Sequence, residues 1–452
     1  MPPLRIAIVG AGVAGLAAAI ALQQHDGIDV QLYERAGELR EIGASIALGP
    51  NGMRTLERLG VSGALEEDVA FRNKSGYPMI YRHWQTNEIV STSSDNAPMT
   101  DTLTDGFLLT HQVSVDQHRG EVATRHRTAR YYRAHLQQAL LAHVDPARIH
   151  LGKAFSRVES DADDSGLTIH FVDGSATIVD VLLGADGINS AVRRAFVPTS
   201  KPEWTGWVAF RSVFEASRVA HIDANLTNEA SHWWAPDRTF FASRLGKDLF
   251  AIVGSWQSDP AAADAPFKTA TWDAEGDIEL LKEFYAQWNP EVRQMIEASP
   301  YTRLYPNTAA QSLDTWVHGQ GRVSFAGDAA HAHGGAFAAG GSLALDDAFA
   351  FASAIFHVYP PESPQKPSRR QLEAALRLYE RTRKPHTDRV LAVVHEGNRK
   401  KVESLGQAET DEQLRQRMQS RGDTSWLHEH DVEAAFARAL STPGVGSTQA
   451  RL

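Results

Sequence analysis

The sequence predicts a mixed α/β protein in which a nucleotide-binding half is interrupted by a β-rich insertion. Three observations predict this class. An apolar, β-branched run at 4–9 is followed by a glycine-rich turn and an apolar helix. Two later strands, at 176–183 and 322–326, each lead into a turn that carries an aspartate. The segment 200–300 is rich in tryptophan and phenylalanine and reads as strands. A length of 452 residues favours two packed domains over one small core.

The first element is the stretch IAIVGAGVAGLAAAIAL at 6–22, which suggests a membrane segment, a secretion signal or a nucleotide-binding turn. It is shorter than the roughly 20 residues that a bilayer requires, and it lacks the flanks of a signal peptide. Its glycines instead follow the pattern GxGxxG. Gly10 permits a tight turn, Gly12 lets a pyrophosphate approach the backbone, and Gly15 lets the helix pack on the strand. We therefore expect a dinucleotide-binding turn, with the helix N-terminus facing the phosphates.

The second strand, IDVQLYE, supports this interpretation because it ends at Glu34, 19 residues after Gly15. A carboxylate at this point accepts a hydrogen bond from a ribose hydroxyl. An acid here suits FAD or NAD and opposes the extra phosphate of NADP. The alternative is a merely structural glycine turn, since GxGxxG on its own is a weak signal.

The remaining elements follow along the chain. A strand at 44–48 precedes a helix at 50–59, because Pro50 suits a first helical turn and Gly60 suits a stop. Helical spacing covers 131–143. Further strands are expected at 167–171, 176–183, 207–214, 249–256 and 322–326, and helices from 371 onward, after a linker at 359–369 rich in Pro, Ser, Lys and Arg.

These elements divide the chain into three parts and a tail. The predicted domains are a discontinuous nucleotide-binding domain (1–75, 110–195 and 300–355), a β-rich substrate domain (76–109 and 196–299), a C-terminal helical region (356–440) and a flexible tail (441–452).

The composition limits the classes of function. A hydrophobic content of 42% and a charged content of 22% fit a soluble globular protein. The net charge of −10 argues against a nucleic-acid partner, and the basic stretch RHRTARYYR at 125–133 is better explained by a phosphate-bearing cofactor. The absence of cysteine removes disulfides, thiolate catalysis and cysteine-based metal sites, and we predict no metal. We expect a cytoplasmic monomer or homodimer without a membrane span.

Two later signatures make the prediction specific. They are LLGADGINSAVRR at 182–194 and RVSFAGDAAHA at 322–332, and they follow the GAGVAG turn in order. Together the three motifs resemble the fingerprints of the flavoprotein aromatic hydroxylases, which are single-component, FAD-dependent (group A) monooxygenases. The stretch at 40–60 resembles the salicylate-hydroxylase branch. The resemblance covers residue 4 to about residue 350. It implies a Rossmann-like FAD-binding domain of the p-hydroxybenzoate-hydroxylase type, a β-sheet substrate domain and C-terminal helices.

The resemblance also implies a reaction. NADH or NADPH would reduce FAD, and reduced flavin with O₂ would form a C4a-hydroperoxide that hydroxylates an electron-rich, phenolic or salicylate-like ring. A second GxGxxG is absent from the sequence, which agrees with a transient visit by the nicotinamide. One alternative is a flavin oxidase or dehydrogenase on the same fold. A non-catalytic nucleotide-binding protein is disfavoured because three separated motifs are intact.

Several residues match positions that contact the cofactor in the family. The resemblance implies that Asp328 binds the ribityl chain, and it also suits a helix cap. Arg133, in RAHL where the family pattern is like R-A-D-L, would be the flavin-side arginine, with His135 replacing the acid. The backbone at Ala47 would lie along FAD, and Gly341 beside the isoalloxazine.

The LLGADG loop, with Asp186, would contact both FAD and the nicotinamide. The chain departs from the family after its GD motif, where Gly335 replaces the usual proline and Ala336 a frequent histidine. This departure puts the geometry of oxygen activation in doubt, but not flavin binding. For His331 and His333, a supporting role near the flavin is favoured over acid–base chemistry.

The substrate site is the least determined part. Arg211, in WTGWVAFRSVF, lies on a strand with apolar neighbours, and an arginine at the corresponding strand position faces the substrate in related phenol hydroxylases. A surface arginine at a sheet edge is an equal alternative. Further candidates for the pocket are His232, Trp233, Trp234, Tyr131 and Tyr132, although core packing is the safer interpretation of the tryptophans.

Overall fold

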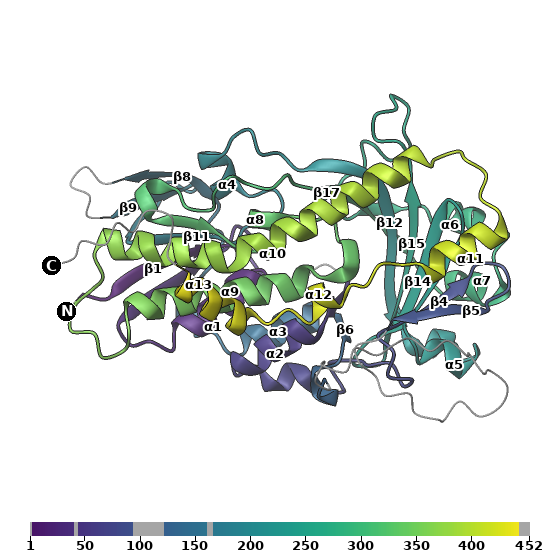
Figure 1. The fold of residues 1–452 in the computed structure, drawn as a ribbon, viewed down its shortest axis with the longest axis horizontal. Coiled ribbons are helices and arrows are strands. Elements are labelled where there is room, and N and C mark those ends of the chain that lie inside the picture. The colour runs from purple at the N-terminus through teal and green to yellow at the C-terminus, as the bar shows by residue number, and fades with distance from the viewer. Residues whose placement is uncertain (1, 40–43, 94–121, 161–165, 443–452) are drawn as a thin grey trace.

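The computed structural model describes residues 2–39, 44–93, 122–160 and 166–442. Parts of the predicted segments 1–75, 76–109 and 110–195, and most of the tail 441–452, lie outside this range. Figure 1 shows two bodies side by side along the longest axis, one around a parallel sheet and one around a larger, mostly antiparallel sheet. Among the described helices, none is both long enough and apolar enough to cross a membrane.

The parallel sheet organises the first body. Its strand order is β18-β11-β1-β2-β7, and every neighbouring pair is parallel. Helix α1 (Val13–Leu22) is buried along its whole length, because it packs between this sheet and α9 (Gly340–Val358). The strands are β1 (Leu4–Val9), β2 (Ile28–Tyr33), β7 (Ile149–His150), β11 (Val181–Gly184) and β18 (Val323–Phe325). Because the strands are parallel, the turns that follow β1, β2, β11 and β18 meet at one edge.

The second body is an eight-stranded sheet in the order β16-β17-β12-β15-β14-β13-β4-β5. One face carries large apolar residues such as Phe210, Trp233 and Phe250 and packs on α6 (Ile278–Phe284) and α7 (Pro290–Glu297). The strands are β4 (Met79–His83), β5 (Ile89–Ser93), β12 (Glu203–Glu215), β13 (Ser231–Trp234), β14 (Arg238–Arg244), β15 (Leu249–Gln257), β16 (Ala274–Gly276) and β17 (Thr302–Ala309).

Smaller elements connect and cover the two sheets. Strand β3 (Ser45–Leu48) pairs with β6 (Ala129–Tyr132), and β8 (Phe155–Ser160), β9 (Leu167–Phe171) and β10 (Ala176–Val179) form a three-stranded sheet. The other helices are α2 (Pro50–Arg58), α3 (Arg133–Leu141), α4 (Ala191–Phe196), α5 (Ala224–Thr227), α8 (Asp328–His331), α10 (Arg369–Glu403), α11 (Asp411–Gln419), α12 (Ser425–His428) and α13 (Val432–Ser441).

The C-terminal helices reach both bodies. Helix α10 runs from the parallel-sheet body toward the eight-stranded sheet (Figure 1), where Lys401 donates to the carbonyl oxygen of Pro236. Helix α11 then packs against β5 through Leu414 and Met418. The region 356–440 is therefore distributed over both bodies rather than forming a compact unit of its own.

Three sequence-based boundaries need correction. The domain boundary at 300 cuts through the eight-stranded sheet, because β17 pairs with β12 and β16. The strand expected at 176–183 is two strands in different sheets, and the break falls at the buried Asp180, which accepts the backbone N–H of Arg5. The helix expected from residue 131 begins at Arg133, since the two preceding tyrosines belong to β6.

Candidate cofactor and substrate site

The glycines of the turn after β1 serve two different purposes, since some are required for packing and one leaves room for a ligand. A Cβ atom added at Gly10, whose φ is +109°, would lie 2.3 Å from the carbonyl oxygen of Ala185, and one added at Gly15 would lie 1.9 Å from that of Gly10. Both glycines are therefore needed for the fold itself. A Cβ atom at Gly12 would meet nothing within 4 Å. Because Gly12 is the N-cap of α1 and makes no side-chain cap, the first N–H groups of the helix face open space that suits an anion.

Glu34 lies beside this turn, at the end of β2. Its Oε2 accepts from the N–H of Ala11 and its Oε1 from the N–H of Ala36, each at 2.9 Å. The side chain is half-buried. A carboxylate has lone pairs beyond these two hydrogen bonds, so it can still accept from a ribose hydroxyl.

The residues of the turn after β11 have structural roles that do not depend on a cofactor. Asp186 accepts the backbone N–H groups of Ala191 (2.7 Å) and Val192 (3.2 Å) in the first turn of α4, whose N-cap is Ser190. From the same motif, the buried Arg193 donates to the carbonyl oxygens of Asp328 (3.2 Å) and Ala329 (2.9 Å). This arginine joins the second motif to the third, a contact that sequence reasoning missed.

The turn after β18 presents Asp328. Gly327 has φ +60° and ψ −143°, a conformation that favours glycine, and its N–H donates to Oδ2 of Asp347 at 2.8 Å. The N-cap of α8 is Gly327, and no side-chain cap is present, so the predicted capping role of Asp328 is wrong. The carboxylate of Asp328 is exposed at the shared edge of the parallel strands, where a ligand can reach it.

The loop after α8 explains the missing proline. Gly335 has φ +71°, whereas proline is restricted to a φ near −65°. The loop therefore follows a path that the usual proline would not allow. His331 lies with Nε2 2.6 Å from Oδ2 of Asp347. His333 is buried, both of its ring nitrogens lack a hydrogen-bond partner among the described residues, and burial lowers its pKa.

Three other predicted residues come together on neighbouring elements. Ala47 lies on β3 opposite Arg130 of β6, and β6 leads directly into α3, which begins at Arg133. A Cβ atom added at Gly341 would lie 2.8 Å from the side chains of both Ile46 and Leu48. Helix α9 thus starts in close contact with β3, which brings Gly341 near Ala47.

Arg211 joins this assembly from the other body. Strand β12 lies between β17 and β15, so the alternative of an arginine at a sheet edge is wrong. The guanidinium lies over the Tyr305 ring, with Cζ 5.4 Å from the ring centroid, and Nη2 would be 3.8 Å from a Cβ atom at Gly335. Burial and the neighbouring Arg133 both lower the pKa of Arg211, while Tyr305 raises it. The side chain therefore points at the loop that follows Asp328.

Strand register places Arg211 in a row of side chains across the sheet. Val253, Phe241, His232 and Tyr81 follow it on successive strands. This row is on the face opposite the apolar core, because the core residues alternate with it along each strand. Burial lowers the pKa of His232 to about 4, so its imidazole is neutral. We call this set the inner row.

Among the other pocket candidates, two are excluded by the structure. Trp233 is fully buried on the core face, and Tyr131 is fully buried with its hydroxyl donating to the carbonyl oxygen of Ala64 at 2.8 Å. Trp234 lies on the same face of the sheet as the inner row, where its Nε1–H donates to Nδ1 of His232 at 3.1 Å. Tyr132 is half-buried and lies edge-on to His135.

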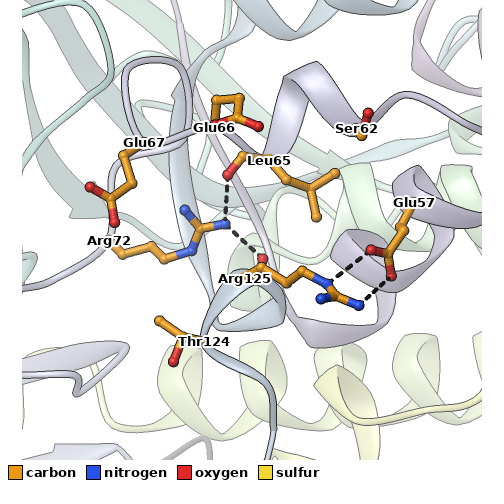
Figure 2. A pocket seen from close by; sticks show the side chains of 8 residues that line it. All are labelled: Glu57, Ser62, Leu65, Glu66, Glu67, Arg72, Thr124 and Arg125. Atoms are coloured by element: carbon orange, nitrogen blue, oxygen red, sulfur yellow. Dashed lines mark hydrogen bonds and ion pairs between the residues drawn. The ribbon is translucent and has the colours of Figure 1, made fainter.

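A surface cavity of about 360 Å³ lies elsewhere and does not contain these residues (Figure 2). Its central Arg72 donates to the carbonyl oxygens of Leu65 and Arg125, and Arg125 forms an ion pair with Glu57. Glu57 and Arg125 are therefore paired with each other, and Arg72 is held by backbone carbonyl groups. The sequence suggested that a cofactor phosphate explains the basic stretch at 125–133. The ion pair of Arg125 with Glu57 shows that contacts within the protein explain part of this stretch instead. The lining residues are Glu57, Ser62, Leu65, Glu66, Glu67, Arg72, Thr124 and Arg125.

Comparisons with known proteins agree with this geometry. A family model described as "FAD binding domain" matches residues 4–393. The 6-hydroxynicotinate 3-monooxygenase of Bordetella bronchiseptica is 30% identical over 403 residues, which is 87% of this chain and 91% of that protein. A salicylate hydroxylase of Pseudomonas putida is 27% identical over 450 residues, with 97% and 94% covered. The solved structure of a salicylate hydroxylase substrate complex shares the fold, with a TM-score of 0.73 at 22% identity over 98% of this chain and 99% of that one.

Proposed function

We propose a substrate class from one premise: the chain belongs to the FAD binding domain family and is an FAD-dependent monooxygenase that acts on an aromatic compound with O₂. FAD is its cofactor, and NADH or NADPH is the reductant typical of the family. The substrate that we propose is a hydroxylated aromatic acid, in which one ring carries both a hydroxyl and a carboxylate.

The observation that carries this proposal is the position of Arg211. A guanidinium pairs with a carboxylate or phenolate through two parallel hydrogen bonds, and its Nε has no hydrogen-bond partner among the described residues. Phe241 and His232 extend from it across the same face and offer flat surfaces for a planar ring. The relatives named for 6-hydroxynicotinate and salicylate act on rings of this kind.

The chain's own residues would divide the work as follows. Gly12 and the N-terminus of α1 would receive the FAD pyrophosphate, Glu34 a ribose hydroxyl and Asp328 the ribityl chain. Arg133, Ala47 and Gly341 would lie along the flavin. The bound cofactor supplies the activation of O₂. Arg211 would orient the acid and favour ionisation of the ring hydroxyl. The Nδ1 atom of the neutral His232 already accepts from Trp234, so its Nε2–H can donate a hydrogen bond to the ionised ring oxygen.

A substrate panel tests this function. Purified enzyme is given FAD and either NADH or NADPH, with ring acids that carry a hydroxyl, the matching phenols without the acid, and the matching acids without the hydroxyl. We expect the hydroxylated acids to stimulate cofactor oxidation and to gain one oxygen by mass. Peroxide formed from a ring compound alone, without NADH or NADPH and without an oxygenated product, would instead indicate an oxidase, the alternative on the same fold.

The same proposal includes three further points. The segments 1–75, 110–195 and 300–355 would form the FAD domain, with the boundary moved past β17, and the protein would be a cytoplasmic monomer or homodimer. Light scattering of the purified protein measures the assembly state.

A further inference from the structure

Two adjacent aspartates on α9 are completely buried and face different elements. Asp346 accepts hydrogen bonds from Nδ2 of Asn51 (3.0 Å) and Oγ1 of Thr55 (2.7 Å), both on α2. Asp347 turns toward the third cofactor motif and toward α10. The two carboxylates therefore have equal burial but different neighbours.

Asp347 uses both of its oxygens. Oδ2 accepts from the backbone N–H of Gly327 at 2.8 Å and lies 2.6 Å from Nε2 of His331, while Oδ1 accepts from Nε of Arg383 at 2.8 Å. Gly327 needs this partner because the residue is buried and its N–H has no access to water. Asp347 thus fixes both ends of the four-residue helix α8, whose first residue is Asp328.

Arg383 supplies the positive charge that balances these buried carboxylates. It is fully buried on α10, and its Nη1 lies 4.0 Å from Oδ2 of Asp346. A buried carboxylate is stable as an ion only with a close counter-ion and hydrogen bonds. Burial alone would raise the pKa of Asp347, but His331 and Arg383 hold it below its ordinary value, whereas burial raises the pKa of Asp346.

We propose that Asp347 is a positioning residue for flavin binding, which sets the Gly327–Asp328 turn through the Gly327 N–H, and that Arg383 of α10 holds Asp347 in place. The C-terminal helix is then part of the cofactor site, although it carries none of the cofactor motifs. This inference rests on the proposed contact between Asp328 and FAD.

The decisive comparison is between two isosteric variants, Asp347→Asn and the control Asp346→Asn. Each removes one charge from the same buried cluster, so both are expected to lower the melting temperature. An asparagine at 347 loses one of its acceptor positions, so we expect the Kd for FAD to rise about 10- to 100-fold. The control should keep the Kd within about twofold, because Asp346 does not contact the turn. At saturating FAD, the flavin absorption spectrum should shift in Asp347→Asn alone, which a loss of stability by itself would not produce.

Arg383→Lys and His331→Gln keep the test decisive if Asp347→Asn does not fold. Lysine lacks the Nε–H at the required position, so the Kd should rise. Glutamine retains a donor for Asp347, so the Kd should stay nearly unchanged. An unchanged Kd for FAD in Asp347→Asn would overturn the inference. If only Arg383→Lys folds, an unchanged Kd in that variant would do the same. An equal rise of the Kd in Asp347→Asn and in Asp346→Asn would also overturn it. If Asp328→Ala also binds FAD normally, the proposed role of Asp328 fails first; if Asp328→Ala weakens FAD binding and Asp347→Asn does not, only the positioning role fails.

Discussion

Substituting alanine for Gly12 and for Gly15 should separate cofactor binding from folding within one motif. A Cβ atom at Gly12 meets no protein atom within 4 Å, and φ of −77° is ordinary for alanine. We therefore expect the free energy of unfolding of the apoprotein to change by no more than about 1 kcal/mol. The same methyl group occupies the space through which a pyrophosphate would approach the backbone. Overpacking of about 1–3 kcal/mol at that contact corresponds to a Kd for FAD that is raised roughly 5- to 150-fold.

Gly15→Ala should show the opposite pattern. Its Cβ atom would lie 1.9 Å from the carbonyl oxygen of Gly10, so strand and helix must move apart. We expect the apoprotein to lose about 3 kcal/mol or more of stability. Urea unfolding of both apoproteins and titration with FAD, followed by flavin fluorescence, measure the two quantities separately. If Gly12→Ala bound FAD with the parent's affinity, the open space at Gly12 would have no role in binding and the assignment of this turn would fail.

Substitutions at four further positions probe the rest of the site. Glu34→Ala should weaken FAD binding while the protein stays folded, and Glu34→Arg should be worse because it leaves an uncompensated charge beside the ribose; unchanged affinity in an FAD titration would contradict the ribose contact. Asp328→Ala should reduce FAD retention on gel filtration with little change in melting temperature, since its side chain caps no helix; a large drop in stability with normal FAD binding would reverse this conclusion. Arg211→Ala should keep the yellow cofactor, raise the KM about 10- to 100-fold and divert reducing equivalents to peroxide, with little rescue by Arg211→Lys, which lacks the planar fork; normal hydroxylation in a coupled assay would move the substrate anchor elsewhere, first to His232. Gly335→Pro, which restores the usual family residue, should impair rather than improve hydroxylation, because the φ of +71° is closed to proline; a variant as active and as stable as the parent would show that this loop conformation is not required.

Local patterns predicted the cofactor half well, for a physical reason. Gly10 and Glu34 each follow a strand directly, Gly12 lies in the same turn as Gly10, and parallel strands bring such turns to one edge. The family assignment, which depends on these motifs, is confirmed by the match over residues 4–393. The contacts of the individual residues with FAD remain predictions.

Side-chain direction and long-range pairing were beyond the sequence. Trp233 and Trp234 are neighbours, and alternation along a strand shows that one must be buried, but not which one. The sequence around Tyr131 fits a helix and a strand equally well, and only the pairing of β6 with β3 shows that it is a strand. Arg383 lies 36 residues after Asp347, on a different helix, and reads as one of many charges on α10. Contacts of this kind depend on how helices pack, which no local pattern encodes.

The packing of α11 against β5 has a consequence for how this protein can be shortened. Among the described residues, β5 is the last strand of the eight-stranded sheet, and Ser91 donates to the carbonyl oxygen of Met418 while Val90 packs on Leu414. A chain cut after α10 would keep every cofactor motif but uncover this strand and its apolar cover. Unprotected strand edges recruit other chains, so such a fragment should self-associate even if it still binds flavin. Helix α11 thus protects the edge of the sheet from aggregation, and a minimal catalytic fragment of this enzyme must include it.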